Sequence, residues 1–473
     1  MIAWQDISIS SIKEGIDELR AQAEKARQVA IDEANDFYYG GDRTKSYLVR
    51  HPAEEDDHWF ARRKRFCHWG YTGAIGETLR DAIAARPIIR EIVGASETVQ
   101  SFFNRIYSGN RVLSLQRDWY QGQVVHGDGF ARVSFSPALG RVVLHSPDVE
   151  NVWIEKHAED ARVMKTYVEE INHPYRKDEL AYWVWTDEAY ILIDGTSEPI
   201  TWEDGYGEVH SGWLDNPYGR IPAAHVRGKP MSNEIWGQSL LVDVIQLNRL
   251  VNNRASDLDR LFEYQAHSQA WVKGQLHTIE TEAGPTRILG LDPGDGEYGY
   301  ATPQARLIEG MESLKDLCSR MFDISGVPDI AVRGGCASSG YELEVRFRRM
   351  DEVVRDMKVE ARPFEEDTAA IVVAVANAHA SEIPKSVKLP EDPEFNIEFE
   401  TQLFPKDEAR EREEDRQDWL NNLMTTEDYL KRQRPDLTEK ELPEYIAKLE
   451  EQRSRTSVFG GTPEAQPTGS LLL

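Results

Sequence analysis

The sequence predicts an α+β fold in which long helices and a β-rich region occupy separate stretches of one chain. Three observations predict it. Residues 120 to 227 consist of short aromatic and β-branched runs, residues 236 to 264 carry apolar side chains at helical spacing, and residues 341 to 382 repeat a helical pattern over a longer stretch. With 473 residues, the chain is long enough for two to four compact units.

The composition argues against several classes of protein. The chain has 55 basic against 82 acidic residues, a formal net charge of −27, which does not suit a protein that grips DNA by neutralising its phosphates. Its three cysteines share no CxxC spacing, so we expect neither a zinc site nor a disulfide framework. The sequence shows no secretory signal and no run of about 18 apolar residues, so we expect neither export nor a membrane span.

The N-terminal half is predicted to begin with helices and to continue as a sheet. Residues 11 to 34 carry apolar side chains at spacings of three and four, and residues 73 to 106 form a second helical zone whose apolar stripe includes Ile89 and Ile92. From about residue 120 the period changes to two, and Gly, Pro and Asp separate the runs. This pattern indicates an antiparallel β region that ends near residue 227.

Two predicted helices flank a short segment of different character. Residues 236 to 264 have no Gly or Pro after Gly237, and a continuous helix of this length would run about 40 Å. Residues 271 to 303 contain turn residues throughout and short β-like pieces, whereas residues 304 to 324 are helical again. We therefore expect a small module held between two long helices.

A glycine-rich break separates these helices from the longest one. Five glycines and prolines between residues 325 and 340 are expected to prevent a regular helix there. Residues 341 to 382 then form a long helix, which Pro363 is expected to bend or break because proline lacks a backbone donor.

The remaining residues are predicted to form a strand, a charged helical region and a tail. Residues 395 to 400 alternate as a strand. The chain beyond Pro405 is highly charged and helical, with a capping signature at Thr425 to Asp428. Residues from about 457 onward are low in apolar content until their end and are expected to be disordered.

This order of elements resembles the portal, or head-to-tail connector, family of long-tailed bacteriophages. Three stretches are similar to that family in their text as well. Residues 220 to 274 contain a Trp-Gly-Gln-Ser opening before the first long helix, residues 322 to 354 place Ser-Ser-Gly before the longest helix, and residues 405 to 420 open with Pro-Lys-Asp.

The resemblance implies a portal fold with a mixed α/β wing, long stem helices, a small α/β clip and a helical C-terminal crown. Its boundaries in this chain would be a wing at 1–235, a first stem helix at 236–264, a clip at 265–305, a second stem helix at 306–324, a tunnel loop at 325–340, a long kinked helix and wing strand at 341–404, a crown at 405–456 and a disordered tail at 457–473.

The resemblance also implies a function. Portal subunits form a dodecameric ring, with thirteen subunits as an alternative for the free ring, at one capsid vertex, through which double-stranded DNA is packaged and ejected. The implied partners are other copies of the chain, double-stranded DNA without sequence specificity, the terminase large subunit, scaffolding and major capsid proteins, and a head-tail adaptor. The implied location is the virion, and the host cytoplasm during assembly, where the ring would nucleate the procapsid. No enzymatic activity, cofactor, metal or membrane partner is expected.

The glycine-rich segment is the one expected to touch DNA in such a ring. An apolar, weakly adhesive tip would come from Val327, Pro328, Ile330 and Val332, while Arg333 would supply one phosphate contact per subunit, and Gly334 and Gly335 would let the loop bend. A passive connection between helices is the alternative for the same residues.

The helices themselves are expected to form the contacts between subunits. The apolar side chains of Leu240, Val244, Leu247 and Val251 would pack on neighbouring copies, and Arg346 and Arg349 would pair with acids across the interface. The alternatives are a core helix of a monomeric domain for the first set and a solvated helix face with local ion pairs for the second.

Catalytic signatures are missing from the sequence. It contains no GxxxxGK[ST], no GxSxG and no HExxH motif. Residues 292 to 297 resemble a fragment of a calcium loop, but their spacing fails, and a tight turn is favoured. His145, His157 and His210 fall in β-like text, where a structural histidine is expected. The competing classes are a nuclease or hydrolase with a carboxylate-held metal and another structural ring, such as a capsid or baseplate component.

Overall fold

The structure is a computed structural model, and it describes residues 23–52, 54–266, 269–273, 297–301, 307–334, 340–399, 415–421, 423–425 and 428–429. The interior of the predicted clip, part of the predicted tunnel loop, most of the predicted crown and the predicted tail lie outside these residues. The chain divides into two compact units, Met1–Ala337 with Leu343–Leu403, and Ser338–Glu342 with Phe404–Leu473.

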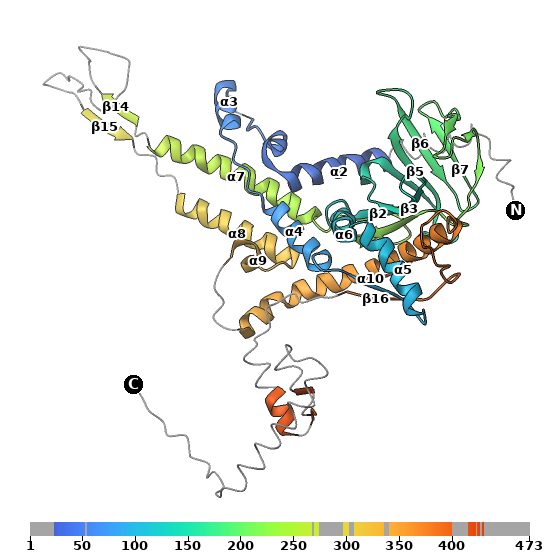
Figure 1. Ribbon diagram of the computed structural model, residues 1–473. Helices are drawn as coiled ribbons and strands as arrows, with labels where there is room; N and C mark the ends of the chain where they lie inside the picture. Colours follow the sequence, from blue (N-terminus) through green and yellow to red (C-terminus); the bar gives the residue numbers. More distant parts are fainter. Residues whose placement is uncertain are drawn as a thin grey trace, which may run out of the picture. The chain divides into compact units, whose positions relative to one another are not determined.

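The N-terminal part of the first unit is helical (Figure 1). Its elements are α2 (Ala23–Tyr39), η2 (Gly41–Tyr47), α3 (Asp56–Lys64), α4 (Tyr71–Ala84), α5 (Glu97–Gly109) and α6 (Val112–Gln121). The described part of the predicted first helix is α2, which extends five residues beyond the predicted end at 34.

The predicted helical zone at 73–106 is wrong in its middle. Strand β1 (Ile89–Ile92) lies there and pairs antiparallel with β16 (Phe395–Glu398). Pro87 disfavours a helical conformation at the residue before it, so α4 has ended by this point. The two isoleucines of the expected stripe therefore point to opposite faces of a strand, with Ile92 buried and Ile89 exposed.

The predicted antiparallel β region is present. One sheet has the order β11-β2-β3 and a second has the order β10-β7-β6-β5-β4. The strands are β2 (Asp128–Ser136), β3 (Arg141–His145), β4 (Val152–Lys156), β5 (Met164–Asn172), β6 (Leu180–Trp185), β7 (Ala189–Asp194), β10 (Leu214–Asp215) and β11 (Ala223–Arg227), and two short pairs join β8 (Trp202–Glu203) to β9 (Val209–His210) and β12 (Lys229–Pro230) to β13 (Gly237–Gln238).

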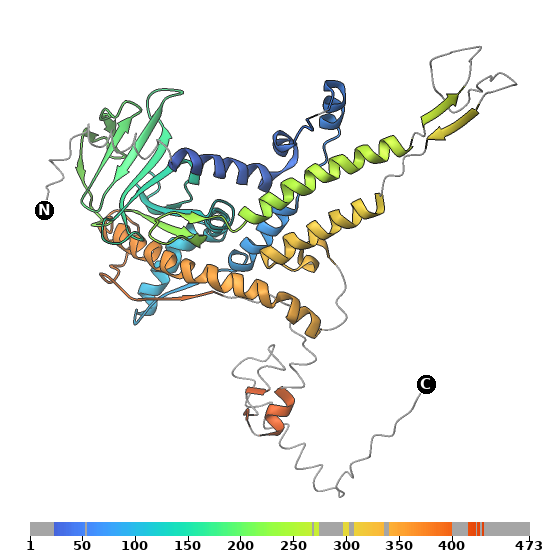
Figure 2. The same ribbon diagram turned by 180° about the vertical axis from the view of Figure 1, so that it is seen from behind.

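Three long helices leave this region (Figures 1 and 2). They are α7 (Val242–Ala266), α8 (Leu307–Ser325) and α10 (Gly340–Ala378). Helix α7 begins six residues later than predicted because Gly237 and Gln238 pair as strand β13. The three helices share one hydrophobic core with α4 and α6, to which Ile75, Trp119 and Phe364 belong.

Helix α10 runs through Pro363, so of the two predicted effects a break is absent and a bend stays a prediction; the helix ends at Ala378 rather than at 382. Proline removes the hydrogen bond to the carbonyl four residues earlier, which belongs to Val359. Val359 is exposed, so water can satisfy that carbonyl, and the helix tolerates the proline. Within the described ranges, no helix combines the length and the apolar content that a membrane span requires.

Of the second unit, residues 415 to 420 are helical, and the rings of Trp419 and Tyr429 stack with their centroids 5.2 Å apart. The backbone N–H of Asp428 donates to Thr425 Oγ1 over 3.1 Å, which is the capping contact that the sequence predicts at this position.

Candidate functional site

Helices α7 and α8 pack antiparallel. Arg254 donates to Ser313 over 2.7 Å, and four residues further along α7, Leu258 packs against Gly310, so the positions on α8 decrease as those on α7 increase. A β-carbon on Gly310 would lie 2.7 Å from Leu258 Cδ2, which shows how closely the helices approach. The two helices are joined at their far ends through β14 (Gln269–Lys273) and β15 (Glu297–Ala301), which pair antiparallel (Figure 1).

Buried amides hold α7 to the first turn of α4. Asn248 has no exposed surface; its Oδ1 accepts from the backbone N–H of Thr72 over 3.1 Å and from the hydroxyl of the same residue over 2.8 Å. Its Nδ2 donates to the carbonyl of Trp69 over 2.9 Å, and Asn252 accepts from the N–H of Trp69 over 3.0 Å. Thr72, Asn248 and Asn252 are buried and paired, so their hydrogen bonds set the position of α7 along α4.

A second connection to α7 is ionic. Arg62 of α3 is 2% exposed at its side chain and donates to both oxygens of Glu54 and, over 2.7 Å, to Asp257 of α7. Arg260 of α7 donates to Glu54 over 2.6 Å. Burial acts to raise the pKa of Glu54, but hydrogen bonds from Arg62 and the backbone of His51, with the positive charges around it, outweigh burial and lower this pKa.

The predicted subunit-contact residues of α7 pack mainly inside their own chain. Val244 and Val251 have no exposed surface, Leu240 is 9% exposed, and Leu247 is half-buried against the same core. The prediction that Val244 and Val251 pack on a neighbouring copy is therefore wrong, because a side chain sealed within one subunit cannot reach another. The apolar stripe used to find a helix marks its core-facing side.

Other apolar side chains on the two helices remain exposed. Leu261 and Phe262 near the end of α7 are 41% and 45% exposed, and Ile308 and Met311 near the start of α8 are 75% and 43% exposed. All four lie toward the ends that carry β14 and β15. Apolar side chains gathered in this way indicate a surface that another molecule covers.

The predicted tunnel loop contains a short helix, α9 (Asp329–Arg333), which the sequence analysis excluded. Pro328 is its N-cap residue and makes no side-chain capping hydrogen bond, and Gly334 ends the helix with φ 72°. Val327 is 1% exposed and therefore does not belong to an exposed tip. Ile330 is half-buried, and Gly335 lies outside the described residues.

The last two residues of α9, Val332 and Arg333, contact other elements of the same chain. The guanidinium carbon of Arg333 lies 5.0 Å from the ring centroid of Tyr71 and 4.8 Å from that of Phe322, distances typical of cation–π contacts. Burial raises the pKa of Tyr71, and the charge of Arg333 partly opposes this. Val332 packs against the main core. In this structure Arg333 is thus engaged by aromatic rings of its own chain.

The two arginines at the start of α10 remain at the surface. Arg346 pairs with Asp329 of α9 over 3.3 Å, and Arg349 is exposed, with its Cγ near the position that a β-carbon on Gly326 would take. Asp351, an acid on the same helix, pairs with Arg355 over 3.1 Å. Pairing of either arginine across a subunit interface stays a prediction.

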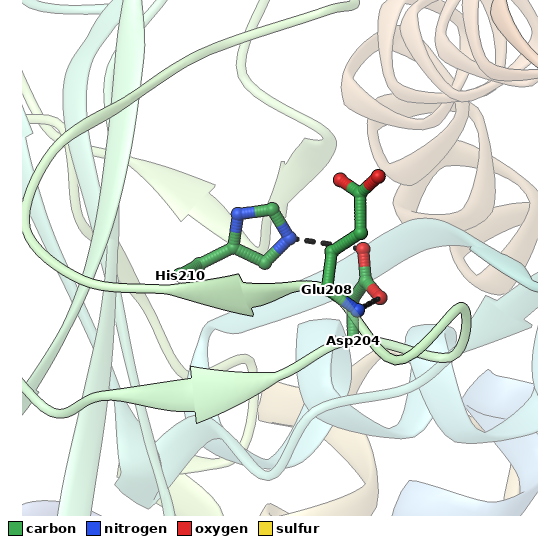
Figure 3. Close-up of side chains that lie close together, drawn as sticks. All are labelled: Asp204, Glu208 and His210. Atoms are coloured by element: carbon green, nitrogen blue, oxygen red, sulfur yellow. Dashed lines mark hydrogen bonds and ion pairs between the residues drawn. The ribbon is translucent and has the colours of Figure 1, made fainter.

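One cluster of potential metal ligands lies in the turn between β8 and β9 (Figure 3). His210 Nε2 lies 2.9 Å from Asp204 Oδ2, and the backbone N–H groups of Tyr206 and Glu208 donate to Asp204 Oδ1. These hydrogen bonds, with the one to His210 as the largest cause, lower the pKa of Asp204. The turn itself supplies hydrogen bonds to Asp204, and a structural role of His210 stays a prediction.

The ionic connection between α3 and α7 is not among the features predicted from the sequence. A usable signal was present, because residues 61 to 65 read Ala-Arg-Arg-Lys-Arg in a strongly acidic chain. The buried amides of Asn248 and Asn252 had no such signal, since asparagines on a helix give no indication of which neighbours they will meet.

Comparison with known proteins gives structural similarity alone. No family model matches the chain, and no curated protein matches it. Among solved structures, it is similar to a chain of the neck of a native GTA particle computed with C12 symmetry, at 13% identity and a TM-score of 0.43, over 81% of this chain and 94% of that one. It is also similar to a chain of the neck of an empty GTA particle computed with C6 symmetry, at 14% identity and a TM-score of 0.41, over 78% and 90%. A chain of the virion of a native gene transfer agent (GTA) particle is similar at 12% identity and a TM-score of 0.41, over 81% and 94%.

Proposed function

We propose that this chain is a non-enzymatic portal subunit, and that copies of it form a ring, expected to be a dodecamer, through which double-stranded DNA enters and leaves a capsid. One observation carries the proposal. Two antiparallel helices, α7 and α8, are fixed at one end to a mixed α/β body, extend to the paired strands β14 and β15, and expose apolar side chains near the ends that carry those strands. Side by side in a ring, such helix pairs form a wall around a hole.

The charge of the chain suits a conduit. A translocating duplex has to slide, and each tight phosphate contact would be a barrier to movement. Many copies with a formal charge of −27 each would repel the duplex from the wall and keep it centred. The same charge also serves solubility, so it supports the channel only together with the helix pair.

The proposal includes partners and locations that follow from a portal role. These are other copies of the chain, double-stranded DNA without sequence specificity, the terminase large subunit, scaffolding and major capsid proteins, and a head-tail adaptor. The ring would nucleate the procapsid in the host cytoplasm and remain at one vertex of the virion.

Electron microscopy of the purified protein in negative stain tests the ring. The expected result is a particle of twelve or thirteen subunits with a central hole, whereas a compact monomer at micromolar concentration would contradict the proposal. A chelator-sensitive nuclease or hydrolase activity would support the competing enzyme class instead.

The role of the segment around α9 has a separate test. Replacement of residues 328 to 338 by a short Gly-Ser link removes the contacts of Val332 and Arg333 but keeps Val327 and the α7–α8 pair, so rings are expected to stay intact. Packaging or retention of DNA should be impaired. Unchanged packaging would remove any role of this segment in DNA handling.

A further inference from the structure

Buried charged side chains hold helix α3 in place. Two arginines and a glutamate lose most of their contact with water in the ionic connection of Arg62, Glu54 and Arg260, and burial of charges is unfavourable unless each is paired. The nine-residue helix packs mainly on α7. Because so short a helix is fixed in this way, we expect its outer side to contact another molecule.

The end of α3 is basic and apolar on its outer side. Residues 62 to 65 are four arginines and lysines, of which Arg62 is buried and Arg65 pairs with Asp259 over 3.5 Å, whereas the exposed acids Asp56 and Asp57 lie in the first turn of the helix. Phe60 is 55% exposed. Arg63 and Lys64 are exposed and form no ion pair or hydrogen bond with any residue that the structure describes. An exposed aromatic ring next to uncompensated cations fits a partner surface that is apolar and acidic.

The outer side of α8 is apolar and acidic. Its exposed apolar side chains include Ile308 and Met311. Exposed acids outnumber exposed bases on the helix, with Glu309, Glu312, Asp316 and Asp323 against Lys315 and Arg320. Within this set, Asp316 already pairs with Arg320, whereas Glu312 has no ion pair among the described residues.

The two surfaces lie at the same level of α7 and on different sides of it. Helix α3 reaches α7 at Asp257, and α8 reaches it one residue later, at Leu258, where Gly310 packs. Both views of the molecule show α7 between α3 and α8 (Figures 1 and 2). Because the two surfaces differ, a contact between them is heterologous, and heterologous contacts between identical chains form a ring when the rotation between neighbours closes.

We propose that α3 of one subunit docks on the outer side of α8 of the next, with Phe60 against Ile308 and Met311, and Arg63 and Lys64 against the acids around Glu312. This inference rests on the proposed ring and names the contact that closes it. The occupant is a second copy of this chain, because its α8 offers the acidic and apolar surface that α3 lacks. Rotation about an axis along α7 would bring the two surfaces together at one height.

Charge reversal tests the contact in the full-length protein. The double change Arg63→Glu with Lys64→Glu should raise the protein concentration at which rings dissociate by about tenfold, measured by native mass spectrometry or light scattering. Adding Glu312→Lys to that variant should restore much of the loss. Phe60→Ala should weaken rings, whereas the control Leu139→Ala, an equally exposed apolar residue in the turn after β2, should not.

Disulfide trapping gives a direct readout. In a Cys67→Ser background, Phe60→Cys with Ile308→Cys should yield covalent multimers under oxidation, and each single cysteine variant should not. Cross-linked monomers alone would overturn the proposal, because the contact would lie within one chain. Unchanged ring stability in the charge variants would also overturn the proposal. If such rings form normally but no longer retain DNA, the basic residues of α3 bind phosphate instead. If the wild-type protein forms no ring, the proposed function itself fails.

Discussion

Arg90 of β1 and Glu365 of α10 form an ion pair with 2.7 Å between Nε and Oε2, and their side chains are 4% and 0% exposed. Tyr120 of α6 donates its hydroxyl to the other oxygen of Glu365 over 2.8 Å. Burial acts to lower the pKa of Arg90, but the charge of Glu365 outweighs it and raises this pKa, so the Arg90 guanidinium stays charged. The pair joins the longest helix to β1 across 275 residues of sequence.

Removing one partner of this pair should destabilise the protein strongly. Glu365→Gln is expected to lower the free energy of unfolding by about 3–5 kcal/mol, because it leaves the Arg90 guanidinium buried without a counter-charge. Urea unfolding monitored by fluorescence measures the change. The matched control is Glu352→Gln on the exposed side of the same helix, which should shift stability by about 0.5 kcal/mol or less. A small effect of Glu365→Gln would show that the pair is not sealed as the structure indicates.

His126 should make the fold sensitive to mild acid. Its Nε2 lies 2.8 Å from Asn35 Oδ1, its Nδ1 is buried without a hydrogen-bond partner among the described residues, and burial lowers its pKa to about 4. Below the unfolded-state pKa of about 6.5 the unfolded chain binds the proton and the folded chain does not, so stability is full above that value and falls as the pH drops toward 4.

Protonation linked to His126 is expected to lower the free energy of unfolding by about 2 kcal/mol between pH 7 and pH 5. Thermal or urea unfolding over this pH range measures it, and His126→Gln should make the stability less dependent on pH. Asn172→Ala, at an exposed strand end without a titratable group, is the control and should keep the wild-type pH dependence. Equal pH dependence in wild type and His126→Gln would contradict the assignment.

Asn248 should matter for the attachment of α7. Asn248→Ala leaves the N–H and hydroxyl of Thr72 and the carbonyl of Trp69 without their partner, and a stranded buried polar group costs about 1–3 kcal/mol. We expect the free energy of unfolding, measured with urea, to fall by at least about 2 kcal/mol. Asn172→Ala, at an exposed strand end, should be nearly neutral. Hydrogen exchange should show faster exchange at the first turn of α4 in Asn248→Ala, and unchanged exchange there would contradict this role.

Gly129 of β2 should not accept a side chain. A β-carbon there would lie 2.2 Å from the carbonyl oxygen of Trp119 and 2.9 Å from Val226 Cγ1, and the backbone of α6 cannot move away without disturbing the core. Gly129→Ala should cost about 1–3 kcal/mol or reduce soluble yield. The control is Gly195→Ala, where no atom lies within 4 Å of the new methyl group. Similar melting temperatures for both variants would contradict the close approach of β2 and α6.

Local patterns in the sequence were sufficient for much of the fold. The helical spacing of apolar residues predicts α7, α8 and α10, and the two-residue period with its turn residues predicts the antiparallel strands between 128 and 227. These predictions succeeded because each pattern records which side of a local element faces apolar surroundings. The capping contact of Thr425 with Asp428 is local in the same sense.

Contacts between distant residues decided the rest. Strand β1 forms because residues 395 to 398 pair with it, and the carbonyl freed by Pro363 is tolerated because Val359 faces solvent. Likewise, only packing shows that Val251 is sealed in its own subunit and that Arg62 pairs with a buried glutamate. A sequence pattern shows the periodicity of a helix or strand. Burial and charge pairing depend on which other elements pack against it, so these contacts are decided only when the chain has folded.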